Sequence, residues 1–163
     1  MNEFEILQNP IAGAHILHEF MKTYVDSDNN EIPPKGIKLP FIFMILPIVF
    51  SKDYVEDISP KNFKFGSLLK SLNNEQLYWS NLSTKMSDYS ILTFSSLNIA
   101  FSSLLLGYDK SSTNVYPVLD ANILNKNTLN KDYKEMLSTA TRLGHWLRDL
   151  SDDEICSYFN LSY

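Results

Sequence analysis

The chain has 163 residues, of which 44% are hydrophobic and 20% charged, and its formal net charge is −5. This length predicts one domain, and this composition excludes intrinsic disorder. Because fourteen Lys and Arg stand against nineteen Asp and Glu, the chain has no overall positive field with which to hold DNA without sequence preference.

Cysteine content and hydropathy exclude further classes of protein. The single cysteine, Cys156, cannot form an internal disulfide, which fits a reducing compartment such as the cytoplasm. The N-terminus has no basic start followed by an apolar stretch, so no secretory signal is predicted. The longest apolar run, residues 39–50, contains two prolines and is shorter than the roughly 18 residues of a membrane span, so no membrane segment is predicted.

The first predicted element is a helix over residues 10–24. Asn9 can cap free N–H groups, and Pro10 suits the first helical position because it has no N–H to satisfy. Gly13 costs this helix up to about 1 kcal/mol, unless another backbone packs closely against it. Apolar residues recur at steps of three and four, as one buried face requires. They are Ile11, Ala14, Leu17, Met21 and Tyr24.

Residues 39–50 are apolar on every side of a helix, which predicts a segment enclosed by the rest of the fold or by a partner chain. Pro40 suits a helix start, whereas Pro47 inside a helix would cost about 3 kcal/mol. We therefore expect a bent helix or two short ones at the centre of the fold. A buried strand is the alternative, because Phe, Ile and Val favour strands, although two prolines argue against a central position.

The middle of the chain predicts further helices. Residues 65–72 predict a short helix with Ser67 as its cap, and Asn74 is expected to cap the segment that follows. Between residues 82 and 108, apolar side chains keep helical steps, which predicts a long helix with a break near Asp88. Gly107 is expected in the last turn of this helix or at its end.

The last third of the chain predicts a short strand or β-hairpin near residues 111–119 and a helix over residues 130–150. Ser151 and Glu154 have the spacing of a capping box before a final helical turn. These elements together predict a mainly α fold, with one helical domain over residues 1–163 and a small β-hairpin. A winged-helix-like arrangement is one form that this fold could take.

The histidines are the first candidates for chemistry. His15 and His18 lie one helical turn apart beside Glu19, a spacing that suits a metal pair on a helix. The order His-x-x-His-Glu differs from the His-Glu-x-x-His of helical zinc hydrolases, and His145 could join the pair only through tertiary folding. Ordinary packing is therefore the favoured interpretation, and a metal hydrolase is the weakest alternative. No metal and no cofactor are predicted.

Nucleophiles and phosphate-binding loops have no suitable context. The serines between residues 80 and 103 lack the Gly-x-Ser-x-Gly turn that exposes a nucleophile. Cys156 follows three acidic residues, unlike the electropositive setting that activates a thiol. The five glycines are isolated, so no phosphate-cradling loop is present. We expect no catalytic residue, no small-molecule substrate and no enzymatic activity.

One segment is basic although the chain as a whole has a negative net charge. Residues 60–72 contain no acidic residue and interleave basic with aromatic side chains, a pattern that could contact phosphate. A solvated face of a short helix is the favoured interpretation. The alternative function is a winged-helix-like DNA-binding module, with residues 65–72 as the recognition helix and residues 115–119 in the wing. The candidate nucleic-acid contacts are Lys61, Lys64 and Lys70.

Four segments, in the same order, resemble the middle component of bacterial three-component ABC systems of the Lamassu-like type. They are residues 9–20, 39–49, 67–72 and 142–147. The last motif of that family usually reads Gly-Arg-Trp-Phe, so Gly144 and Trp146 match it whereas His145 and Leu147 depart from it.

The resemblance implies a non-enzymatic adaptor that joins an SMC/Rad50-like ABC ATPase to an effector protein, commonly a nuclease, in defence against phage or plasmids. DNA would be reached through the complex. The ten Phe, nine Tyr and two Trp exceed what a core of this size is expected to hide, which suggests a permanent partner. Trp and Arg are also enriched in binding hot spots, although core packing of Trp146 explains it equally well. The expected partner-binding residues are Asn9, Pro10, Leu46, Pro47, Gly144, Trp146 and Arg148.

Overall fold

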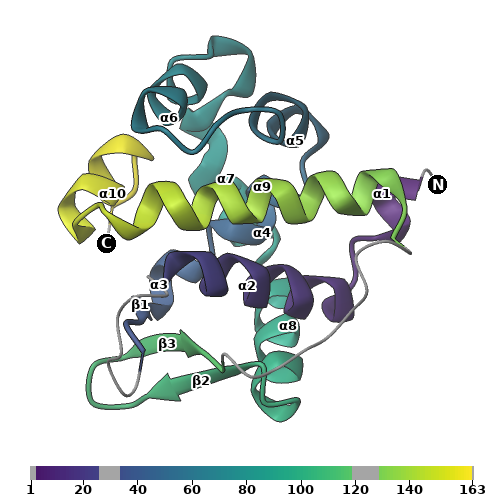
Figure 1. The fold of residues 1–163 in the computed structure, drawn as a ribbon, viewed down its shortest axis with the longest axis vertical. Coiled ribbons are helices and arrows are strands. Elements are labelled where there is room, and N and C mark those ends of the chain that lie inside the picture. Colours follow the sequence, from purple (N-terminus) through teal and green to yellow (C-terminus); the bar gives the residue numbers. More distant parts are fainter. Residues whose placement is uncertain (1–2, 26–33, 119–128, 163) are drawn as a thin grey trace.

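The computed structural model describes residues 3–25, 34–118 and 129–162. Helices dominate these residues, and a small antiparallel sheet lies at one end, which confirms the predicted mainly α fold with a β-hairpin (Figure 1). In chain order the elements are α1 (Glu3–Ile6), α2 (Pro10–Tyr24), β1 (Ile37–Lys38), α3 (Leu39–Ile42), α4 (Ile45–Val49), α5 (Lys52–Ile58), α6 (Phe65–Leu72), the 3-10 helices η1 (Glu75–Leu77) and η2 (Trp79–Asn81), α7 (Leu82–Asp88), α8 (Ser90–Ser102), β2 (Leu106–Asp109), β3 (Asn114–Pro117), α9 (Lys131–Arg148) and α10 (Asp152–Tyr158).

Helix α2 lies at the centre, packed against α9 on one side and α8 on the other. Glycines permit both contacts. A Cβ atom at Gly13 of α2 would clash with the Ser96 side chain of α8. A Cβ atom at Gly144 of α9 would lie 2.6 Å from the Phe20 carbonyl oxygen of α2. At Gly13 the close neighbours are the Ser96 and Leu46 side chains rather than a backbone.

The start of α2 is also as predicted, because the Asn9 side chain accepts hydrogen bonds from the N–H groups of Ile11 and Ala12. The predicted buried stripe is wrong at its first position, since Ile11 is 73% exposed. Every residue from Ala12 to Met21 is buried instead. The reason is that α2 is enclosed by neighbouring helices, so its burial does not follow one face.

Residues 39–50 form two short helices, α3 and α4, as predicted, and the alternative of a buried strand is not observed. Pro40 lies in the first turn of α3, where its missing N–H breaks no helical hydrogen bond. Pro47 lies inside the buried helix α4. The Pro47 carbonyl oxygen accepts a hydrogen bond from the Ser51 hydroxyl at 2.7 Å.

Two predicted caps are only partly right. Helix α6 begins at Phe65 with Lys64 as its N-cap, so Ser67 is not the cap. The Ser67 hydroxyl instead donates to Asn62 Oδ1 at 2.7 Å. Asn74 does cap the next element, but that element is the short 3-10 helix η1.

The predicted long helix is divided into α7 and α8 at Tyr89, next to the expected break. Its end is wrong, because Gly107 lies in strand β2 and α8 stops at Ser102. Leu104 takes the left-handed backbone conformation there, with φ of 56°, and the Leu105 N–H donates to the Ala100 carbonyl oxygen at 2.9 Å. A leucine thus fills the helix-ending position that sequence patterns assign to glycine.

The sheet has strand order β1-β3-β2, with Ile37 opposite Val115 and Leu106 opposite Pro117. The hairpin starts at residue 106, earlier than predicted, because β2 follows α8 almost directly. Figure 1 places this hairpin at the lower end of the molecule and α6 at the upper end. The segments proposed as wing and recognition helix therefore do not lie together as a winged helix requires.

The C-terminal elements follow the prediction. Asn130 caps α9 by accepting a hydrogen bond from the Tyr133 N–H at 2.8 Å. Ser151 and Glu154 form the predicted capping box at the start of α10. Within the described ranges, no helix is long and apolar enough to span a lipid bilayer.

Candidate functional site

The two histidines of α2 have separate partners. His15 Nδ1 lies 2.6 Å from the Tyr133 hydroxyl of α9, and His15 Nε2 lies 3.9 Å from the Glu19 carboxylate. Burial raises the pKa of Tyr133, so its hydroxyl remains protonated in this contact. His18 is fully buried, with Nε2 at 3.2 Å from the Val118 carbonyl oxygen, and this burial lowers the pKa of His18.

A metal site needs a third ligand beside the pair. His145 does not provide it, because its ring stacks on Phe63 at a centroid distance of 4.3 Å. Among residues 3–25, 34–118 and 129–162, no group of three or more His, Cys, Asp or Glu is arranged to hold a metal ion. The His15 contact with Tyr133 instead joins α2 to α9, and the His18 contact joins α2 to the residue that follows β3.

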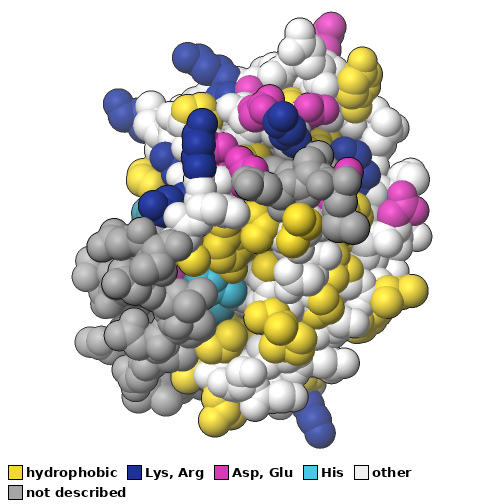
Figure 2. Space-filling model, turned by 90° about the vertical axis from the view of Figure 1, so that its right-hand side faces the viewer, with side chains coloured by type: hydrophobic (Ala, Val, Ile, Leu, Met, Phe, Trp, Pro, Cys, Tyr) yellow, Lys and Arg dark blue, Asp and Glu magenta, His cyan; other side chains and the backbone are white. Residues whose placement is uncertain are grey.

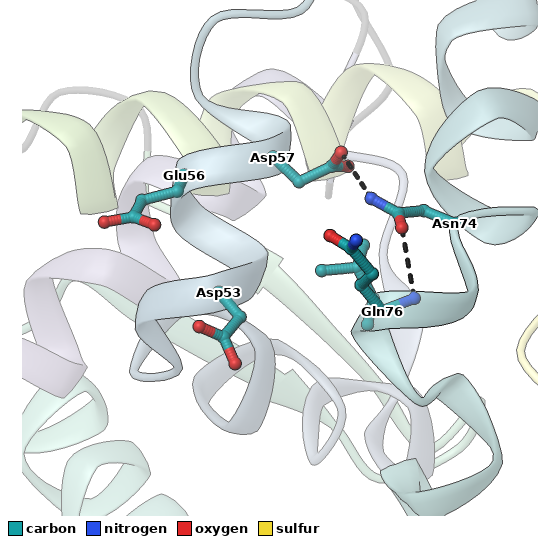
Figure 3. Close-up of a pocket in the computed structure, with 6 residues that line it drawn as sticks. Asp53, Glu56, Asp57, Asn74 and Gln76 are labelled. Atoms are coloured by element: carbon teal, nitrogen blue, oxygen red, sulfur yellow. Dashed lines mark hydrogen bonds between the residues drawn. The ribbon is translucent and has the colours of Figure 1, made fainter.

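A polar pocket of about 420 Å³ lies between α5 and the residues that follow α6 (Figure 3). Figure 3 shows Asp57 directed toward Asn74, whereas Glu56 of the same helix points away from it. The carboxylates therefore do not converge on one point in the pocket. Its lining residues are Asp53, Glu56, Asp57, Asn74, Gln76 and Leu77.

Asp57 is engaged by its own chain. Its carboxylate accepts hydrogen bonds from the Ser71 hydroxyl at 2.6 Å and from Asn74 Nδ2 at 3.0 Å, and it lies 2.7 Å from Lys61 Nζ. Burial alone would raise the pKa of Asp57, but these hydrogen bonds outweigh burial, so the pKa lies below its ordinary value. This cluster fixes α5 against the end of α6, so its role is structural.

The basic segment does not form one phosphate-binding surface. Lys61 is held in the ion pair with Asp57, and its side chain is mostly buried. Lys64 and Lys70 are exposed, but they lie at opposite ends of α6. The structure therefore brings these three lysines to different places.

Most of the expected partner-binding residues are in the interior. Leu46 and Pro47 lie in the buried helix α4. Gly144 faces α2, and Trp146 is buried on α9 with no hydrogen-bond partner for its indole N–H among the described residues. These residues can influence a partner only through the fold.

The remaining motif residues lie nearer the surface. Asn9 and Pro10 form the start of α2, where Asn9 caps the helix. Arg148 ends α9 and is half-buried, and its carbonyl oxygen accepts a hydrogen bond from Lys35 Nζ at 2.9 Å. Their contact with a partner stays a prediction.

Three large apolar side chains on and beside α8 are exposed. Ile91 is 80% exposed, Phe94 is 57% exposed and Leu104, just beyond the helix, is 71% exposed. The Phe94 ring packs edge-on against Phe43 at 4.8 Å. We call the outer side of α8 with Leu104 the α8 surface. In Figure 2, hydrophobic side chains gather in the lower half, where α8 lies, and most charged side chains lie above them.

A second exposed apolar region lies at the other end of the molecule. The rings of Phe65 in α6 and Tyr158 in α10 meet at 5.7 Å, and both side chains are exposed. Phe63 is two residues before Phe65 in the chain. The Arg142 guanidinium lies 5.1 Å from the centroid of the Phe63 ring. We call these four residues the aromatic surface.

Sequence reasoning did not single out the α8 surface, although a signal was present. Residues 90–107 contain no Asp, Glu, Lys or Arg, and apolar residues occupy all sides of the helix. A surface helix normally has a charged or polar outer side. An uncharged stretch of this length is therefore unusual for a surface helix.

Comparison with known proteins gives one finding. A family model described as "ABC-three component (ABC-3C) system Middle Component 3" matches residues 1–161. Comparisons with curated proteins and with solved structures find no match. The matched range includes both exposed apolar surfaces.

Proposed function

The chain belongs to the middle component 3 family of ABC-three component systems, and from this premise we propose that it is a non-catalytic adaptor. In this proposal it links an SMC/Rad50-like ABC ATPase to an effector protein, commonly a nuclease, in a Lamassu-like bacterial complex that acts against phage or plasmids in the cytoplasm. DNA is reached through the complex rather than by this chain alone.

The observation that carries the proposal is the pair of separate apolar surfaces. An adaptor needs a binding surface for each of two partners, and the two must not overlap. The aromatic surface lies at the upper end of the molecule in Figure 1, around α6 and α10, and the α8 surface lies at the lower end. Exposed aromatic and aliphatic side chains are the residue types that form the cores of stable interfaces.

The polar groups of the described residues favour binding over catalysis. The Asp57 carboxylate is satisfied by Ser71, Asn74 and Lys61, and His15 bonds to Tyr133. A catalytic acid or base must instead reach a substrate from a cleft. These groups stabilise helix contacts, which is what a rigid adaptor requires.

Co-expression tests the proposal. The tagged chain is expressed with the ATPase and effector components of its system, and both are expected to co-purify with it. Mixing each component separately with the chain should show two binary complexes. If the tagged chain retains neither component and stays a monomer, or if the purified chain hydrolyses a nucleotide or a nucleic acid unaided, the adaptor proposal fails.

The DNA-binding alternative has its own measurement. The chain alone is expected not to retain duplex DNA, even at low salt, because of its net charge of −5. Retention that weakens in Lys64→Glu and Lys70→Glu would favour the alternative.

A further inference from the structure

Two segments without acidic residues meet at the aromatic surface. Residues 60–72 contain three lysines, residues 136–148 contain both arginines of the chain, and neither segment contains Asp or Glu. The Phe63 ring of the first segment stacks on the His145 ring of the second at a centroid distance of 4.3 Å. The fold therefore gathers basic and aromatic side chains in one place on a chain whose net charge is −5.

Two of these cations have no anionic partner within the described ranges. There, no carboxylate lies within 4.0 Å of Lys64 Nζ or of the Arg142 guanidinium. The Lys64 side chain is exposed. Two carbonyl oxygens accept hydrogen bonds from Arg142, which fixes its position over the Phe63 ring but does not neutralise its charge. Both charges are therefore available to a carboxylate of another molecule.

His145 lies between these charges in a positive local field. Burial lowers the pKa of His145, the charges of Arg148 and Arg142 lower it further, and the charge of Asp149 opposes them. The N-terminus of α6, which has no side-chain cap, adds positive partial charge beside Phe65. This part of the surface therefore attracts anions, although the chain as a whole is negative.

We propose that the aromatic surface binds a short acidic segment of a partner protein, whose Asp or Glu side chains meet Lys64 and Arg142 while an apolar side chain packs on the rings. This inference rests on the proposed adaptor function and names the chemistry of one of its two partners. The rings of Phe63, Phe65 and Tyr158 are 46%, 42% and 37% exposed. Because one aromatic side chain offers about 150–250 Å², they leave roughly 250 Å² of accessible area. Each side of an obligate interface buries roughly 1,000 Å² or more, so this area fits a short segment better than a whole domain.

A single-stranded nucleic acid is the alternative occupant, because basic and aromatic side chains also bind phosphates and bases. A strand needs a row of cations along its backbone. Here Lys70 lies at the other end of α6, and Lys61 is held by Asp57. The net charge of −5 also repels a long polyanion more strongly than a short segment. An acidic segment of a protein therefore fits this surface better.

The first experiment reverses one charge in the co-expressed complex. The Lys64 side chain is exposed, so Lys64→Glu is expected to keep the unfolding midpoint of the chain. Its affinity for one component should fall about tenfold, while the other component stays bound. Raising the salt concentration from about 50 mM to about 500 mM should weaken the same contact in the unmodified chain, because salt screens exposed charges. Lys110→Glu, between β2 and β3 at the opposite end of the molecule, changes the net charge equally and should bind both components as before.

The second experiment identifies the acidic group by carbodiimide cross-linking. The reagent activates a carboxylate, the lysine amine attacks it to form an amide, and the reagent leaves as a urea. Lys64 is therefore expected to be linked to an Asp or Glu of the component that Lys64→Glu weakens, as read by mass spectrometry. Lys64→Arg keeps the charge but has no primary amine, so it should bind that component without forming this link.

The outcomes are distinguishable. If the unmodified chain binds neither component, the adaptor function fails and this inference fails with it. If the chain binds its components but Lys64→Glu binds them as tightly, or Lys64 is linked to no acidic residue of either, only the acidic segment is overturned. Equal weakening by Lys64→Glu and Lys110→Glu would assign the loss to net charge and overturn it as well. If the isolated chain binds a single-stranded oligonucleotide and Lys64→Glu abolishes that binding, the surface belongs to a nucleic acid and the inference is wrong.

Discussion

Substitution of Gly144 by alanine tests whether close packing of α2 against α9 holds the fold together. A new Cβ atom would lie 2.6 Å from the Phe20 carbonyl oxygen and would also clash with the Thr23 side chain. Ordinary contacts begin at 3.4 Å, so the two helices must move apart. We expect this overpacking to cost about 2–3 kcal/mol. Alanine recovers about 1 kcal/mol through its higher helix propensity. The net loss is about 1–2 kcal/mol, or about 2–8 °C in the unfolding midpoint.

Gly66→Ala is the matched control, because Gly66 lies in α6 and its new Cβ atom would meet nothing within 4 Å. Here only helix propensity acts, so a gain of up to about 1 kcal/mol is expected. Urea and thermal unfolding, followed by circular dichroism, measure both variants. If Gly144→Ala is as stable as the unmodified chain, or if both variants shift in the same direction, the packing argument is refuted.

Three further predictions concern buried polar groups. The Trp79 indole N–H donates to the Ser71 carbonyl oxygen at 2.8 Å, whereas the Trp146 indole N–H has no partner among the described residues. In urea titrations, Trp79→Phe should therefore lower the free energy of unfolding by about 1–3 kcal/mol more than Trp146→Phe does. Although burial raises the pKa of Asp57, its hydrogen bonds bring it below the ordinary value, so this carboxylate stabilises the fold above about pH 4 and loses that effect as the pH falls. Asp57→Asn should therefore flatten the acid side of the stability curve, and an unchanged curve would contradict this role. Burial lowers the pKa of His18 from 6.5, so its stabilising effect is complete above that pH and is lost as the pH falls below it. In His18→Leu the unfolding midpoint should fall less between about pH 7.5 and pH 5.5 than in the unmodified chain, and an equal fall would assign the pH dependence to other groups.

Helix starts were predictable from the sequence because a cap is satisfied within three residues. The Asn9, Asn130 and Ser151 side chains each accept a hydrogen bond from a backbone N–H two or three residues later. Such contacts depend on local geometry alone, so residue type and spacing identify them. The choice of helix over strand for residues 39–50 was also predictable from local chemistry, since proline is disfavoured in a central strand.

The features that were missed depend on contacts between distant residues. Glycine is the local choice for a helix end, so Gly107 was expected there, but Leu104 takes the left-handed conformation at the end of α8 instead. The Asp57 cluster joins residues that are 14 and 17 positions apart, and no pattern relates them. Burial of Leu46 was expected from the all-apolar segment 39–50, whereas for Trp146 the sequence left core packing and partner binding equally open, and only the packing of the helices decides between them.

The central position of α2 has a consequence for biosynthesis. Along the sequence this helix precedes both helices that cover it, since α8 begins at residue 90 and α9 ends at residue 148. Its apolar sides, buried in the finished fold, therefore stay open until α9 has been translated. Exposed apolar surface makes a nascent chain prone to aggregate, and a partner that is translated nearby could bind the finished fold only after α9 has emerged.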